Sequence, residues 1–161
     1  MSFLKPDGTS FHYYSEIFLG TGTNSIVLRR GPHALKIPKV GDTATMSREY
    51  RGDEEYINKA NREMLELEKA VYLRVGRCAG IAECINISKD GILLALYERG
   101  DLERYIKDDV KVGRSQKAGW ILSIIKTILH FHNAKVLVDD MALRNILIAD
   151  DLTLKLIDFS Q

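Results

Sequence analysis

The chain has 161 residues, 45% of them hydrophobic and 28% charged, which is typical of a soluble globular protein with one domain or two small lobes. Its formal net charge of +1 gives no large field to attract nucleic acid or an anionic membrane. The apolar runs are far shorter than the roughly 20 residues of a membrane span, and the N-terminus carries neither a signal core nor a myristoylation glycine. We expect a cytoplasmic protein with no nucleic-acid or membrane partner, and find no evidence in the sequence for an oligomer.

The first predicted strands flank a loop that contains two glycines. Residues 16–19 and 26–29 read as short strands, separated by Gly20-Thr21-Gly22-Thr23-Asn24-Ser25. Glycines at alternate positions let the backbone approach a ligand closely and offer amide groups to phosphate oxygens. A flexible hairpin turn explains the same residues equally well, so this loop alone does not decide between the two interpretations.

A third strand is predicted over residues 33–37, after a Gly31-Pro32 turn and before Pro38. It carries Ala34 and Lys36. A lysine here is either a surface residue on an edge strand or a functional residue. The glycine loop just before it favours the second interpretation.

A long helix is predicted from about Glu54 to Val75, after a polar loop at 39–53 in which Asp53 is a plausible N-cap. Glu68 falls near the middle of its apolar stripe. A buried, unpaired carboxylate costs about 3–5 kcal/mol, so a cation should face it. Lys36 is the natural partner, and the alternative is that Glu68 extends to the helix edge or meets Arg62 or Arg74 instead. The stripe itself consists of Ile57, Ala60, Met64, Leu65, Leu67, Val71, Tyr72 and Val75.

Gly76 ends this helix, and two strands at 81–87 and 92–96 follow, joined by a turn at 89–91. The segment after Tyr97 breaks the second strand and opens a short helix that runs through Ile106.

Ser115 is a good N-cap for a further helix at 116–133, and two short strands at 146–148 and 154–157 follow it. The apolar face of the helix is wide enough for the core of a second lobe, and it comprises Trp120, Ile121, Ile124, Ile125, Ile128 and Leu129.

Two carboxylates and a carboxamide lie beside these last two strands. Asp140 stands five positions before Asn145, and Asp158 directly follows the second strand. Hard oxygen ligands suit Mg²⁺, which binds through one or two carboxylates together with substrate phosphates. The remaining carboxylate can orient an attacking hydroxyl group.

These motifs together resemble the protein kinase signature in order and rough spacing. The resemblance implies an α+β, protein kinase-like fold: a five-stranded antiparallel N-lobe sheet with helix αC, and a truncated helical C-lobe. It places the N-lobe at about 11–96, the hinge at 97–100 and the partial C-lobe at 101–161. The motifs are Gly20-x-Gly22-x-x-Ser25-x-Val27, Ala34-x-Lys36, Glu68, Asp140-x-x-x-x-Asn145 and Asp158-Phe159.

The resemblance also implies ATP and Mg²⁺ as cofactors and assigns catalytic roles. Asp140 would accept the proton of the substrate hydroxyl, and Lys36, paired with Glu68, would hold the ATP phosphates. Asn145 and Asp158 would hold Mg²⁺. The implied nucleotide contacts are Gly20, Thr21, Gly22, Ser25, Val27, Ala34, Lys36, Leu94 and Leu147.

The activity implied is transfer of the γ-phosphate of ATP to Ser, Thr or Tyr hydroxyls of a protein. The chain departs from the family at Val138-Asp139, where His-Arg is usual, and at Ser160, where the glycine of Asp-Phe-Gly is usual. No activation segment follows before Gln161, so we expect a fragment or a truncated relative. The alternatives are a pseudokinase that binds nucleotide without turnover and a small-molecule kinase of the aminoglycoside or choline type, against which the full glycine loop argues.

Overall fold

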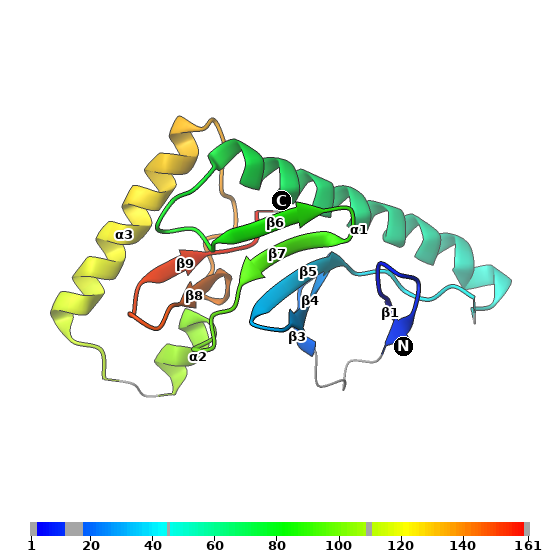
Figure 1. The fold of residues 1–161 in the computed structure, drawn as a ribbon, viewed down its shortest axis with the longest axis horizontal. Coiled ribbons are helices and arrows are strands. Elements are labelled where there is room, and N and C mark those ends of the chain that lie inside the picture. The colour runs from blue at the N-terminus through cyan, green and yellow to red at the C-terminus, as the bar shows by residue number, and fades with distance from the viewer. Residues whose placement is uncertain (1–2, 12–17, 45, 109–110, 160–161) are drawn as a thin grey trace. The chain divides into compact units, whose positions relative to one another are not determined.

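The computed structural model describes residues 3–11, 18–44, 46–108 and 111–159 (Figure 1). They divide into two compact units. Unit 1 comprises the described residues of Met1–Lys69 and Cys84–Ala95, and unit 2 comprises those of Ala70–Glu83 and Leu96–Phe159. The lobe and hinge boundaries expected from the sequence stay a prediction.

Unit 1 contains the five-stranded antiparallel sheet that the sequence predicts, so that prediction is confirmed. The strand order is β3-β4-β5-β7-β6 (Figure 1). The strands are β3 (Phe18–Thr21), β4 (Ser25–Arg30), β5 (His33–Pro38), β6 (Cys84–Ser88) and β7 (Gly91–Ala95).

Two of these strands differ from the prediction at their ends. Strand β3 runs on through Gly20 and Thr21, which pair with Val27 and Ile26, so the glycine loop is shorter than expected. The first two residues of the predicted strand, 16 and 17, lie outside the described residues. Strand β6 begins only at Cys84, because Ile81 instead forms a parallel bridge within unit 2.

An N-terminal hairpin that the sequence did not predict completes the core of unit 1. It consists of β1 (Phe3–Leu4) and β2 (Ser10–Phe11), which pair antiparallel. Phe3 and Phe11 are buried against one face of the sheet, and the Leu4 amide donates to the Val40 carbonyl at 2.9 Å. On that face they cover Ile26, Leu28, Leu35 and Ile37.

Helix α1 (Arg48–Val75) begins six residues before the predicted start at Glu54. Asp53 is therefore inside the helix and is not its N-cap. The first turn is closed by the Arg51 amide, which donates to the Ser47 carbonyl. Gly52 and the polar residues around it are typical of a loop. A glycine inside a helix costs only about 1 kcal/mol of helix stability, however, and the other 27 residues of α1 outweigh that cost.

The buried face of α1 is also more polar than the predicted stripe. Ile57 and Leu67 are 47% and 58% exposed, whereas Asn58 and Asn61 are buried. Asn58 exchanges two hydrogen bonds with the backbone of Gly41, at 2.8 and 3.0 Å. These side chains satisfy the backbone between β5 and α1, a role that hydrophobic periodicity cannot reveal.

Unit 2 contains α2 (Leu102–Lys107), α3 (Arg114–Asn133), the 3₁₀ turn η1 (Leu143–Asn145) and the hairpin of β8 (Ile146–Ile148) and β9 (Leu154–Leu156). Helix α3 starts two residues before the prediction, with Gly113 at the N-cap position, so Ser115 lies inside the helix.

The expected apolar face of α3 is only partly buried. Trp120 and Phe131 are buried, but Ile121, Ile125 and Leu129 are about half exposed or more. Within the described part of the chain, no helix is both long enough and apolar enough to cross a membrane.

The β6–β7 turn yields a prediction about stability. A Cβ added at Gly91 would lie 2.2 Å from the Lys36 carbonyl oxygen, which is backbone and cannot move aside cheaply. We expect Gly91→Ala to lower the free energy of unfolding by about 1–3 kcal/mol in urea titrations. Gly52→Ala is the matched control: it meets nothing within 4 Å on an exposed stretch of α1 and should stabilise by up to about 1 kcal/mol. Equal effects of the two substitutions would contradict the close approach of β7 to β5.

Candidate active site

The centre of the candidate site in unit 1 is a buried ion pair between β5 and α1. The Lys36 Nζ lies 2.8 Å from Oε1 and 2.6 Å from Oε2 of Glu68. The two residues are 5% and 1% exposed. The pairing predicted from the apolar surroundings of Glu68 is thus observed, and the alternatives with Arg62 and Arg74 are wrong.

The face of the sheet that carries Lys36 also carries most of the predicted nucleotide contacts. Residues directly opposite each other in an antiparallel sheet share a face. Val27 is opposite Lys36, Ala34 is opposite Leu94, and Gly20 is opposite Val27. Because Ala34 and Lys36 are two residues apart on one strand, all five lie on the face opposite the Phe3 and Phe11 core.

The glycine loop is a tight hairpin closed on itself. The Gly22 amide donates to the Ser25 carbonyl at 2.9 Å, and the Thr21 hydroxyl donates to the same oxygen at 3.3 Å. Ser25 is buried, whereas Thr21 and Gly22 are exposed. In this conformation the Gly22 amide donates within the loop. A phosphate could accept from this amide only after its hydrogen bond to the Ser25 carbonyl is broken.

Unit 2 brings the predicted base and one predicted metal ligand together. The Asn145 amide group donates to Oδ2 of Asp140 at 3.0 Å and to its backbone carbonyl at 3.2 Å. Arg144 donates to the same Oδ2 and forms an ion pair with it. Asn145 is buried, Asp140 is 23% exposed at its side chain, and Arg144 is 62% exposed.

The role of Arg144 as the partner of Asp140 was not predicted from the sequence. A cation four residues after a carboxylate was the available signal, but this spacing is informative only on a helix. Here the segment between the two residues is extended backbone followed by the short turn η1, which brings the guanidinium back onto Asp140.

Asp158 follows β9 and is tied to this cluster through the backbone. The Ile157 amide donates to the Asn145 carbonyl at 2.9 Å, which places Asp158 one residue from that link. Asp158 has φ of +66°, a left-handed conformation that costs most non-glycine residues about 1–2 kcal/mol.

Phe159 anchors the backbone just after Asp158. It is 8% exposed, and its ring centroid lies 5.2 Å from that of Tyr72 and 4.8 Å from that of Phe131. This side chain packs against aromatic rings of α1 and α3 and so holds the backbone just after Asp158. Sequence reasoning named Phe159 only as part of a motif and missed these two aromatic partners.

The predicted site residues thus fall into two groups. Unit 1 holds the ion pair, the glycine loop and the adenine contacts other than Leu147, while unit 2 holds Asp140, Asn145, Leu147 and Asp158. An amide oxygen and a carboxylate are hard donors of the kind Mg²⁺ takes, and because the Asn145 NH₂ group donates to Asp140, the amide oxygen is the atom that could bind a metal. Among the described residues no group of three or more His, Cys, Asp or Glu side chains could hold a metal.

Comparison with known proteins agrees with these motifs. The model of the family described as protein tyrosine and serine/threonine kinase matches residues 36–160, which is well over half of the chain. The chain is also similar to the serine/threonine-protein kinase PLK4 of Aedes aegypti, with 32% identity over 69 residues. That stretch is 42% of this chain and 9% of the relative, so the chain spans only a small part of the relative's length.

The buried ion pair leads to a prediction about coupling. We expect Lys36→Met and Glu68→Leu to each cost about 3–5 kcal/mol in urea unfolding, because each removes a partner of opposite charge from a buried ion. The double variant should recover much of that loss. The control is the pair of Lys59 and Glu63 on the same helix, which is 3.8 Å apart and largely exposed, and should show coupling of only about 0–0.5 kcal/mol. Additive losses at Lys36 and Glu68 would show that the two charges do not depend on each other.

Proposed function

Because the chain belongs to the protein tyrosine and serine/threonine kinase family, we propose that it binds ATP with Mg²⁺ and phosphorylates protein hydroxyls. The observation that carries the proposal is the buried pair of Lys36 and Glu68. It sits on the sheet face that also bears Val27, Ala34 and Leu94. A cation held in this way beside small apolar side chains suits a ligand with both a flat ring and phosphates.

In this proposal Lys36 contacts the α- and β-phosphates, and Glu68 fixes the position of its ammonium group. An unpaired lysine side chain samples many rotamers, and ordering it costs up to about 2 kcal/mol. The ion pair with Glu68 orders the Lys36 side chain before ATP binds, so ATP binding does not have to supply that free energy. This is catalysis by positioning and charge neutralisation, which dominates phosphoryl transfer.

Asp140 is the proposed base. The substrate hydroxyl oxygen attacks the γ-phosphorus, the bond from that phosphorus to the β–γ bridging oxygen breaks, ADP leaves, and Asp140 takes the hydroxyl proton. The hydrogen bonds from Arg144 and Asn145 fix the direction in which the Asp140 carboxylate points. Asn145 and Asp158 would hold Mg²⁺, which when bound neutralises charge on the phosphate oxygens.

A second function, nucleotide binding without transfer, is favoured by one observation. The same carboxylate oxygen of Asp140 accepts from both Arg144 and Asn145. A carboxylate oxygen that already accepts from two donors has less capacity left for a substrate hydroxyl. Val138 and Asp139, which stand where the family has His-Arg, fit this alternative as well.

The experiment measures nucleotide binding and transfer on the same protein. We expect ATP with Mg²⁺ to raise the melting temperature, and ³²P from γ-labelled ATP to appear on casein or on a glutamate–tyrosine copolymer. Lys36→Met, Asp140→Asn and Asp158→Asn should each lower transfer by about 100-fold or more, since each removes a group that acts in the transition state.

Matched controls are Lys59→Met and Asp150→Asn, which alter exposed side chains and should leave both signals unchanged. Circular dichroism of every variant separates lost function from lost fold. ATP stabilisation with no detectable transfer would support the second function. A folded protein whose melting temperature does not change when ATP and Mg²⁺ are added would contradict both proposed functions.

A further inference from the structure

The first ten residues of α1, residues 48–57, lie on the surface of unit 1. All of them are exposed except Glu54, which is partly buried. In Figure 1 these first turns of the helix, coloured cyan, extend past the strands of unit 1. This part of α1 therefore gains little stability from packing against the sheet.

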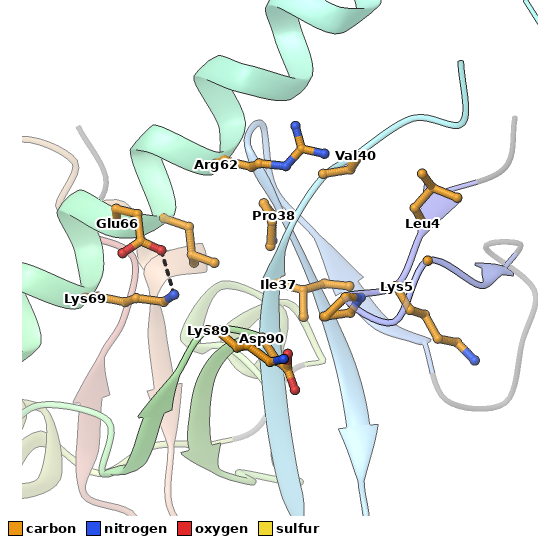
Figure 2. Close-up of a pocket in the computed structure, with 13 residues that line it drawn as sticks. Leu4, Lys5, Ile37, Pro38, Val40, Arg62, Glu66, Lys69, Lys89 and Asp90 are labelled. Carbon is orange, nitrogen blue, oxygen red and sulfur yellow. Dashed lines mark hydrogen bonds and ion pairs between the residues drawn. The ribbon is translucent and has the colours of Figure 1, made fainter. Parts of the chain in front are cut away.

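The anchored part of α1 begins immediately afterwards, at Asn58. The side chain of Asn58 is buried and exchanges two hydrogen bonds with the backbone of Gly41. Figure 2 shows the turns that follow, with Arg62 and Lys69 beside the end of β5. Residues 48–57 can therefore unwind while the rest of the helix stays in place.

Unwinding of residues 48–57 requires little free energy. A helix of about ten residues is only marginally stable in water without packing, and Gly52 lowers its helix propensity further. Among the described residues, the ion pairs of α1 begin only at Lys59. Segments of low local stability open without unfolding of the whole protein. We therefore expect this segment to become extended transiently in the folded chain.

Tyr56 is the nucleophile in this segment. It is 76% exposed, more than any other tyrosine among the described residues. Three acids, residues 53–55, directly precede it, and Ile57, which is 47% exposed, follows it. When the segment is extended, carboxylates lie on one side of the Tyr56 hydroxyl and an apolar side chain lies on the other.

Tyr50 lies in the same segment but in a different setting. It is 65% exposed, so its hydroxyl is nearly as accessible as that of Tyr56. Its neighbours are Arg48, Glu49 and Arg51, which together carry a net positive charge. The two tyrosines are therefore a matched pair that differs mainly in the charge around the hydroxyl.

We propose that Tyr56 is a phosphorylation site for a separate tyrosine kinase with a cationic substrate groove. The acids before Tyr56 supply charge complementarity, and Ile57 supplies an apolar contact. The Tyr56 Oη attacks the γ-phosphorus of ATP, the bond from that phosphorus to the β–γ bridging oxygen breaks, ADP leaves, and the phenol proton passes to a base of that kinase. The product adds about −1.5 to −2 charges beside three acids, which opposes the return of this segment to a helix.

The test incubates the whole 161-residue chain with γ-labelled ³²P-ATP, Mg²⁺ and an added tyrosine kinase that phosphorylates the glutamate–tyrosine copolymer. A parallel reaction without added kinase is subtracted. Trypsin then places Tyr56 in the peptide 52–59 and Tyr50 in the peptide 49–51. We expect about tenfold or more label on Tyr56 than on Tyr50, and no label on the peptide 52–59 in Tyr56→Phe.

The role of the acids is tested with Asp53→Asn/Glu55→Gln, which alters two exposed side chains. Labelling of Tyr56 should fall by about fivefold or more, because the charge that the kinase groove attracts is removed. The matched control is Glu63→Gln, an exposed acid on the anchored part of the same helix, which should be labelled as the unchanged chain is.

Label on Tyr56 no higher than on Tyr50, or equal labelling of the Asp53→Asn/Glu55→Gln variant, would overturn the proposal. So would equal label on Tyr72, which is 5% exposed, because the substrate would then be the unfolded chain. Copolymer in a companion tube confirms that the added kinase is active. Since the reaction without added kinase is subtracted, these outcomes do not depend on whether the chain itself transfers phosphate.

Discussion

The arrangement of unit 1 depends on one electrostatic constraint, the ion pair of Lys36 and Glu68 at 5% and 1% exposure. Two charges removed from water are costly unless their geometry is held closely, because the cost of desolvation is several kcal/mol for each ion. The pair therefore requires β5 at the centre of the sheet and Glu68 on the turn of α1 that faces Lys36. Hydrogen bonds from Asn58 and Asn61 to the backbone of the β5–α1 connection fix that register.

The sequence predicted the features that depend on local pattern and on charge. Alternation and turn residues located β4, β5, β8 and β9 to within a residue or so, and the expectation that a buried acid needs a cation led from Glu68 to Lys36. The errors arose where tertiary contacts decide the outcome. The start of α1, the buried Asn58 and the N-terminal hairpin all depend on partners distant in sequence, which propensity does not contain.

The catalytic segment shows a different limit of sequence reasoning. Asp140, Asn145 and Asp158 were identified by spacing, and the structure joins them through the Asn145 side chain and the Ile157 amide. Spacing did not reveal that Arg144 shares the Asp140 carboxylate, nor that Asp158 adopts a left-handed conformation. Both are properties of backbone geometry in a loop. They affect how the Asp140 and Asp158 side chains are presented, and so bear on the choice between the two proposed functions.

The buried positions of Phe3 and Phe11 have a practical consequence for protein production. The family match starts at residue 36, and a recombinant boundary drawn there would delete β1 to β4 and the first half of β5, and leave Ile37 without the aromatic rings that cover it. Deleting only the first eleven residues would still expose a contiguous apolar surface, which favours aggregation. A purification tag on this chain is therefore best separated from Phe3 by a flexible spacer.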